Sequence, residues 1–374
     1  MNKIFFCSLL IITFFSCKSP VEQQPQVTNR QENVVGTGDI RDLVLIYYGG
    51  DQRNPREGWN GLDENGRQMA VDWNVQQFAP YVSARSENGK TENWLFDGFL
   101  FLEIIDGKYG MASGYKPTPA RKDNWIKMMD KYLAAGKGVR ALDECIELAK
   151  QRCKDQLKKR KIVISLPEPV PNQKDWGELD GKSLDFSSDE DRIAACKWYI
   201  DYVTECFRKA SLRNVELSGF YWLAEEATHT RTFVGKVADY IHLNDFRFYW
   251  IPYFQSDGYN EWRDLGFDQA FLQPNHFFNN KIPDSRIDDA CALAKSLGMS
   301  VEMEFDEDAL DGKGREKRLR AYIDGFKRNN IFETLDIAYY QSHQALYLLC
   351  HGTDNDKAFY KELTDIIATR QKRL

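Results

Sequence analysis

The sequence is poor in the residues that usually hold a metal ion. It contains five histidines, none at the spacing of metal ligands, and none of its eight cysteines forms a Cys-x-x-Cys pair. We therefore expect no metal site and no cofactor. The same scarcity disfavours a metal-dependent hydrolase or lyase.

Signatures of nucleotide and nucleic-acid binding are also missing. No Gly-x-Gly-x-x-Gly follows the first apolar run, and no Walker loop occurs in the chain. The net charge is −6, and the longest basic run is Lys158-Lys159-Arg160-Lys161, at the end of a helical pattern. These absences disfavour a doubly wound nucleotide-binding sheet, and nucleic acid is not an expected partner.

Long apolar runs are absent after the N-terminus, so we expect no transmembrane helix. The N-terminus is typical of a secretory leader, because Asn2-Lys3 precedes an apolar stretch too short to span a bilayer comfortably. That stretch ends in Phe14-Phe15-Ser16-Cys17, which resembles a bacterial lipobox. The resemblance implies that residues 1–17 are a lipoprotein signal peptide and that Cys17 is lipidated.

Residues 18–40 are rich in Gln, Pro, Asn and Glu, a composition that cannot bury a core, so we expect a flexible tether. The prediction is a lipoprotein of the bacterial outer membrane or cell surface, or one that faces the periplasm. Its only contact with the membrane would be the N-terminal lipid.

The remaining residues, 41–374, contain eight strand-like apolar runs. They lie near 43–48, 95–103, 161–166, 217–224, 246–254, 269–273, 300–305 and 335–340. Nearly every pair is separated by a helical pattern, such as 138–159, and this alternation is typical of a parallel sheet with helical crossovers. The sequence thus predicts a single α/β domain, a (β/α)₈ TIM barrel, with long βα loops after the early strands.

Two of these runs end in clustered acid. The run from Leu217 to Ala224 stops at Glu225 and Glu226, and the run that begins at Val301 places Glu302 and Glu304 on one face of a strand. An acidic, solvated helix start is the plainer explanation for the first cluster. Because catalytic groups of barrel enzymes come from the C-terminal ends of strands, two acidic ends together favour a paired-carboxylate site.

The other strand ends carry hydroxyl, amide, carboxyl and single imidazole groups, with no cluster of Arg or Lys. Such groups suit a hydroxyl-rich ligand better than a phosphate. The side chains that we expect to bind substrate are Tyr48, Glu103, Tyr253, Asp257, Gln273, Asn275, His276, Gln341 and His343. Glu168 and Asp306 stand at strand ends too, without an assigned role.

Acid after strands four and seven of an eightfold barrel resembles the retaining glycoside hydrolases. The lipobox, the segment Phe-Asp-Gly-Phe-Leu-Phe at 96–101 and Gly-Phe-Tyr-Trp at 219–222 resemble a family of bacterial lipoproteins with a glycosidase-like barrel and no known function. The resemblance implies an acid/base glutamate after strand four and a nucleophilic glutamate after strand seven. In that superfamily an Asn usually precedes the acid/base, whereas Ala224 precedes Glu225 here.

Position along the strand gives the assignment within one pair, and strand parity gives it within the other. Glu304 lies nearer the end of its strand, so it is the expected nucleophile, while Glu302 would orient it or bind a neighbouring hydroxyl. Glu225 shares the parity of Tyr221 and is preferred to Glu226 as the acid/base. The predicted function is hydrolysis of a poly- or oligosaccharide by two carboxylates, and the alternative is a catalytically silent barrel that binds glycans.

Overall fold

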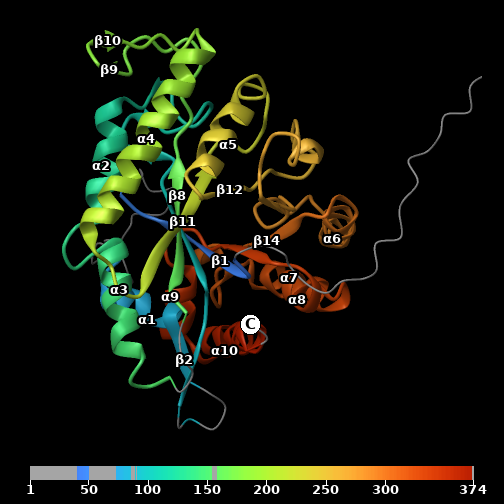
Figure 1. Cartoon of the computed structure of the whole chain (residues 1–374). Coiled ribbons are helices and arrows are strands. Elements are labelled where there is room, and N and C mark those ends of the chain that lie inside the picture. Colours follow the sequence, from blue (N-terminus) through green and yellow to red (C-terminus); the bar gives the residue numbers. More distant parts are fainter. Residues whose placement is uncertain (1–39, 50–72, 86–88, 90, 154–157, 373–374) are drawn as a thin grey trace, which may run out of the picture. The chain divides into compact units, whose positions relative to one another are not determined.

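The computed structural model describes residues 40–49, 73–85, 89, 91–153 and 158–372, which belong to one compact unit, Val35–Leu374. Eight parallel strands form a closed barrel in which each strand pairs with the next in chain order, and β15 pairs with β1 (Figure 1). The barrel strands are β1 (Asp42–Tyr47), β4 (Gly98–Leu102), β8 (Arg160–Leu166), β11 (Val215–Trp222), β12 (Arg247–Trp250), β13 (Gln269–Leu272), β14 (Ser300–Glu304) and β15 (Ile337–Tyr340). The predicted single-domain TIM barrel is confirmed. Cys17, the signal peptide and the predicted tether up to residue 39 lie outside the described residues.

Helices pack around this barrel, with α2, α3 and α4 on the left of the strands in Figure 1 and α6, α7 and α8 on the right. Their bounds are α1 (Val75–Val82), α2 (Lys122–Tyr132), α3 (Gly138–Ala149), α4 (Asp189–Ala210), α5 (Val234–Leu243), α6 (Ser285–Leu297), α7 (Glu316–Arg328), α8 (Ile331–Thr334), α9 (Ala345–His351) and α10 (Asp354–Gln371). Two 3₁₀ turns, Tyr259–Glu261 and Glu307–Ala309, lie in the later loops. The sequence did not predict α5, α8 or α9.

The early βα connections are the long ones, as expected. They contain short strands outside the barrel, namely β5 (Ile105–Asp106), β6 (Tyr109–Gly110), β7 (Thr118–Pro119), β9 (Glu178–Leu179) and β10 (Lys182–Ser183), while β2 (Ser83–Arg85) and β3 (Glu92–Trp94) lie between α1 and β4. One of them shortens a predicted helix. The helix expected over 138–159 ends at Ala149. The chain then runs beside β3, because Cys153 forms a backbone β-bridge with Glu92, and the Glu92 amide donates to the Arg152 carbonyl at 3.2 Å.

Barrel strands are buried on both faces, as in other parallel sheets covered by helices. Every residue of β4 and of β14 is buried. On β11, Trp222 packs edge-on against Phe233 beside α5 at a ring distance of 5.9 Å. Trp222 therefore faces the helices, and its neighbour Tyr221 faces the barrel interior, where the charges of Glu225 and Glu302 act on it.

The pairing of β11 with its neighbours is irregular at a glycine, Gly219, in the middle of the strand. The pairing of β11 with β8 shifts between Leu217 and Gly219, and a Cβ at Gly219 would collide with the backbone of Arg247 on β12. A glycine therefore allows the two strands to approach closely here. This irregularity sets which side chains of the last half of β11 face inward.

The N-terminal end of the barrel is closed by buried ionic groups. Asp97 accepts hydrogen bonds from the amides of Arg41 and Asp42, at 3.0 and 2.8 Å. Arg370 of α10 pairs with Asp42 at 2.7 Å, and both side chains are almost fully buried. The last helix is thereby tied to the first strand.

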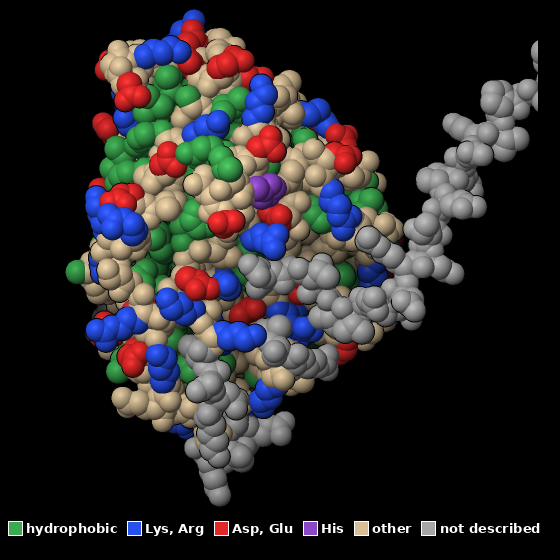
Figure 2. All heavy atoms as spheres, in the orientation of Figure 1, with side chains coloured by type: hydrophobic (Ala, Val, Ile, Leu, Met, Phe, Trp, Pro, Cys, Tyr) green, Lys and Arg blue, Asp and Glu red, His purple; other side chains and the backbone are tan. Residues whose placement is uncertain are grey.

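On the face shown in Figure 2, the Lys and Arg side chains of the described residues are interspersed with Asp and Glu. Among the described residues, no helix is both long enough and apolar enough to cross a bilayer.

Candidate active site

A pocket of about 190 Å³ opens beyond the ends of β8, β11 and β12. A loop that follows β4 contributes one side of it. The lining residues are Ser113, Tyr115, Glu168, Ala224, Glu225, Glu226, His229 and Tyr253. Three of the eight are glutamates, and no Lys or Arg is among these described residues. The pocket is therefore acidic and rich in hydroxyl groups.

Glu225 lies three residues beyond β11 and is partly exposed in the pocket. The Tyr115 hydroxyl donates to its Oε1 at 3.2 Å. Burial raises the pKa of Glu225 to about 7, and the charges of Glu304 and Glu226 act in the same direction against the effect of the Tyr115 hydrogen bond. Near neutral pH this carboxyl can both give and accept a proton.

Glu226, the next residue, turns toward β12. It accepts a hydrogen bond from the Tyr253 hydroxyl at 2.8 Å, and this bond is the main cause that raises the pKa of Tyr253 to about 12. The tyrosine therefore stays protonated and holds the Glu226 carboxylate. This contact separates the roles of two adjacent glutamates, because each binds a different tyrosine.

Glu168, at the end of β8, adds a third carboxyl to the pocket wall. Its Oε2 accepts the Ser113 amide at 2.7 Å, and its Oε1 lies 3.8 Å from a guanidinium nitrogen of Arg192 on α4. Burial raises its pKa. Sequence reasoning noted this strand end but gave Glu168 no role.

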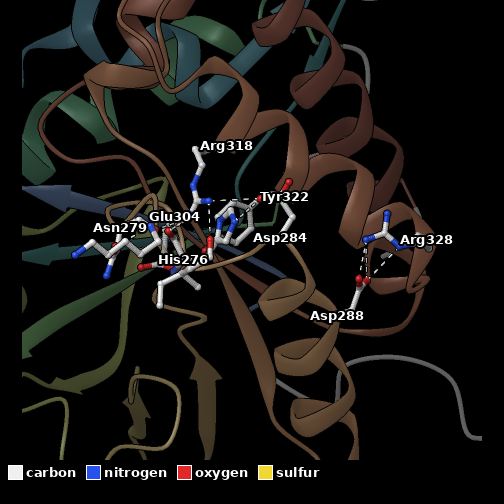
Figure 3. A network of polar contacts seen from close by, with 10 residues as sticks. His276, Asn279, Asp284, Asp288, Glu304, Arg318, Tyr322 and Arg328 are labelled. Carbon is white, nitrogen blue, oxygen red and sulfur yellow. Dashed lines mark hydrogen bonds and ion pairs between the residues drawn. The ribbon is translucent and has the colours of Figure 1, made fainter.

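Glu304, the last residue of β14, is fully buried and surrounded by donors (Figure 3). Gln273 Nε2 donates to its Oε1 at 3.1 Å, and the His276 amide donates to its Oε2 at 3.1 Å. The Tyr322 hydroxyl of α7 also donates to Oε2. Burial raises the pKa of Glu304, but these donors oppose the rise because they favour the charged form.

Glu302, two residues earlier on β14, is almost fully buried. Burial and the charges of Glu304 and Glu225 all raise its pKa well above the ordinary value. The contrast with Glu304 lies in the donors, since both glutamates are buried in the same strand. Glu304 is therefore the more readily ionised of the two glutamates.

The structure brings several predicted ligand-binding residues to these glutamates. Gln273 and His276 contact Glu304, and the Asn275 backbone lowers its pKa by a hydrogen bond, although the Asn275 side chain is exposed. Tyr253 lines the pocket. Asp257 lies near the pocket but binds Arg231 at 2.5 Å and is not among its lining residues.

Other predicted residues lie in the supporting structure instead of the described pocket. Gln341 is fully buried, accepting the Tyr81 hydroxyl at 3.0 Å and donating to the Leu45 carbonyl at 3.2 Å. The Glu103 carboxyl accepts the amide of Ile104 at 2.8 Å, which closes its own turn.

Tyr48 and His343 are partly exposed but are not among the residues that line the pocket. Tyr48 lies beside Tyr132 with a ring distance of 6.4 Å. The ring of His343 lies 3.9 Å from a carboxyl oxygen of Glu307, whose Oε1 also accepts the His343 amide at 3.2 Å.

Two tyrosines that bind the glutamates were not predicted. Tyr115 lies in a loop after β4, where its place between Gly114 and Lys116 gives no periodic signal. Tyr322 lies on the apolar face of α7, where a tyrosine is typical of a helix core. Only the barrel topology brings them to Glu225 and Glu304. Among the described residues no group of three or more His, Cys, Asp or Glu side chains is arranged to hold a metal ion.

Fold and site together define a (β/α)₈ barrel with a carboxylate-lined pocket at the C-terminal ends of its strands. The chain belongs to the family described as "Domain of unknown function (DUF4855)", whose model matches residues 61–365. A comparison with curated proteins finds no match.

Solved barrel structures resemble this chain at low sequence identity. A GH18 chitinase from Pseudoalteromonas aurantia is 11% identical, with 86% of this chain and 99% of that one covered and a TM-score of 0.41. A putative alpha-L-fucosidase from Bacteroides thetaiotaomicron is 12% identical, with 89% and 97% covered and a TM-score of 0.43. An endo-1,4-beta-mannanase from Rhizomucor miehei is 16% identical, with 64% and 78% covered and a TM-score of 0.38. The functional argument therefore rests on the side chains of this chain.

Proposed function

We propose that this protein is a retaining glycoside hydrolase that acts on a poly- or oligosaccharide. Glu225 is the acid/base and Glu304 the nucleophile. The observation that carries the proposal is the difference between the two carboxyls. Glu225 is partly exposed in the pocket with a pKa of about 7, and Glu304 is buried among three donors.

In the first step Glu225 would give its proton to the leaving glycosidic oxygen while the Glu304 carboxylate attacks the anomeric carbon. In the second step Glu225, now ionised, would take a proton from the water that releases the sugar from Glu304. The charge of Glu304 raises the pKa of Glu225. When Glu304 loses that charge on attack, the pKa of Glu225 should fall, so Glu225 would be ionised and able to act as the base in the second step.

A second function has one observation in its favour. Glu304 has no exposed surface and is not among the described residues that line the pocket. A catalytically silent barrel that binds glycans would need the hydroxyl and carboxyl groups of the pocket but no access to Glu304. The two functions therefore differ in what happens when Glu304 is changed.

The test compares Glu304→Gln, Glu225→Ala and a control, Glu216→Gln, at the far end of β11. We expect Glu304→Gln to lower kcat by several orders of magnitude, because the amide is a very poor nucleophile. Glu225→Ala should impair substrates with poor leaving groups far more than activated aryl glycosides, which need little protonation. The control should match the wild type on both substrates.

Proton NMR of the first-formed product gives the anomeric configuration, which a retaining enzyme keeps. Inversion of the anomeric configuration would mean that a water molecule, and not Glu304, attacks the anomeric carbon. Glycan binding without hydrolysis by the wild-type protein, across chromogenic glycosides and purified polysaccharides, would favour the silent barrel.

We further propose that the protein is a lipoprotein anchored through Cys17 to the outer membrane or cell surface. The support is the lipobox-like segment Phe14-Phe15-Ser16-Cys17, which follows a short apolar stretch. A barrel that degrades or binds polysaccharide outside the cell would benefit from such an anchor.

A further inference from the structure

The helix α7 reaches Glu304 by two routes. Directly, the Tyr322 hydroxyl donates to the Glu304 carboxylate. Indirectly, Arg318 lies one turn earlier on the same face of α7 and binds the loop that leads from β13 to α6. Figure 3 shows Arg318, Tyr322 and His276 converging around Glu304.

A single guanidinium holds this loop at several points. Arg318 Nη1 donates to the Ile282 carbonyl at 2.8 Å, and its Nη2 donates to the Asn279 carbonyl at 2.9 Å and to the His276 carbonyl. Asp284, at the start of α6, lies 3.5 Å from Nη1. The Arg318 side chain is only 13% exposed. The planar fork of an arginine suits such a set of acceptors, and a lysine cannot reproduce it.

The held loop carries one of the donors of Glu304. The His276 amide donates to the Glu304 carboxylate, while the carbonyl of the same residue accepts from Arg318. The His276 ring is held as well, by Asp284 at 2.8 Å and by an edge-on contact with Tyr322 at 5.3 Å. The backbone around His276 is thus fixed from both sides.

We propose that Arg318 is a positioning residue for Glu304, because its hydrogen bonds to the loop between β13 and α6 keep the His276 amide within hydrogen-bond distance of the Glu304 carboxylate. The inference rests on the proposed role of Glu304 as a nucleophile, and it goes further by naming what sets the charge of that nucleophile. Arg318 does not touch a substrate in this account.

The expected consequence concerns the protonation of Glu304. The groups that face its carboxyl are the carboxyls of Glu302 and Glu225 and the donors from Tyr322, Gln273 and the His276 and Asn275 backbones. The positive charge of Arg318 also acts on Glu304 through space. Loss of the amide donor disfavours the carboxylate, so the pKa of Glu304 should rise.

The experiment compares Arg318→Ala and Arg318→Lys with Arg320→Gln, which removes an arginine on α7 that pairs with Glu362 at 2.8 Å. In protein labelled with ¹³C at the glutamate carboxyls, the Glu304 signal is assigned from Glu304→Gln and titrated with pH. We expect its pKa to rise by about one unit in both Arg318 variants, the size of one lost hydrogen bond to a charged group. The acidic limb of the kcat/KM profile should move by the same amount, and Arg320→Gln should change neither.

Two results would overturn the inference. These are an unshifted Glu304 titration in a folded Arg318→Lys protein and an equal shift in Arg320→Gln. If Arg318→Ala is shifted beside an unshifted Arg318→Lys, the charge at position 318 matters and not the hydrogen bonds of the guanidinium to the loop. If Arg318→Ala does not fold, Arg318→Lys decides. A wild-type protein that hydrolyses no glycoside would refute the proposed function, while the titration would still test Arg318.

Discussion

Changing Tyr115 to Phe should move the alkaline limb of the pH–activity profile to higher pH, so that the variant keeps a larger share of its maximal activity at alkaline pH than the wild type does. The Tyr115 hydroxyl donates to Glu225 Oε1 and so stabilises the charged form of that carboxyl. The Phe variant keeps the ring but loses the donor, so the pKa of Glu225 rises. Because the acid/base works in its protonated form in the first step, the alkaline limb of kcat/KM should move to higher pH.

The size of the shift follows from the geometry. A hydrogen bond to a charged group contributes about 1.5–3 kcal/mol, and the 3.2 Å length of this one places it near the lower value. At about 1.4 kcal/mol per unit, that is roughly one pKa unit. The midpoint should thus move from about 7 to roughly 8. At pH 8 the protonated fraction of Glu225 would rise about fivefold, from roughly a tenth to a half.

The assay is kcat/KM between pH 5 and pH 9 on an unactivated glycoside, with each profile normalised to its own maximum. Normalisation removes any loss of substrate binding that the missing hydroxyl causes. Tyr253→Phe is the matched control, since Tyr253 donates to Glu226 and not to Glu225. An unmoved or acid-shifted midpoint in Tyr115→Phe, or an equal shift in the control, would refute the role of Glu225 as the acid.

Two further predictions concern stability and location. Burial raises the pKa of Asp336 from 3.8 to about 7 at the barrel floor, so its folded-state pKa lies above the unfolded value and stability should fall as pH rises from about 4 to 7. At roughly 1.4 kcal/mol per unit the loss is about 4 kcal/mol, and Asp336→Asn should remove it from urea unfolding curves measured across that range. A parallel pH dependence in both proteins would exclude Asp336 as the cause. Cys17→Ala should release the protein from membranes and abolish labelling with a fatty acid, and unchanged membrane partitioning would contradict the lipoprotein proposal.

The fold could be predicted because its signals are local and repeated. Apolar runs such as 161–166 and 217–224, separated by helical patterns, are enough to indicate parallel strands with crossovers. The end of α3 could not be predicted in the same way. It depends on a bridge between Cys153 and Glu92, which lie far apart in the sequence. Local propensity continues a helix until a tertiary contact of this kind takes the chain elsewhere.

The site could be predicted only in part, for a related reason. Parallel barrel topology brings strand ends together, so acid after β11 and β14 was found from the sequence. A polar residue at a strand end has two uses, however, because it can face the pocket or satisfy nearby backbone groups. The side chains of Glu103 and Gln341 bond to nearby backbone groups instead of facing the pocket. The sequence contains no signal that separates these uses.

Glu225, Glu302 and Glu304 show why the identity of a residue does not give its role. All three are glutamates with raised pKa values, and burial is the first cause in each. They differ in their donors, since Glu225 has the Tyr115 hydroxyl, whereas Glu304 has Gln273, the His276 amide and Tyr322. These donors come from a loop, a strand end and a helix that are distant in the chain. The roles that we propose for Glu225 and Glu304 thus rest on what surrounds each carboxyl, and α7, through Tyr322 and Arg318, supplies much of the difference at Glu304.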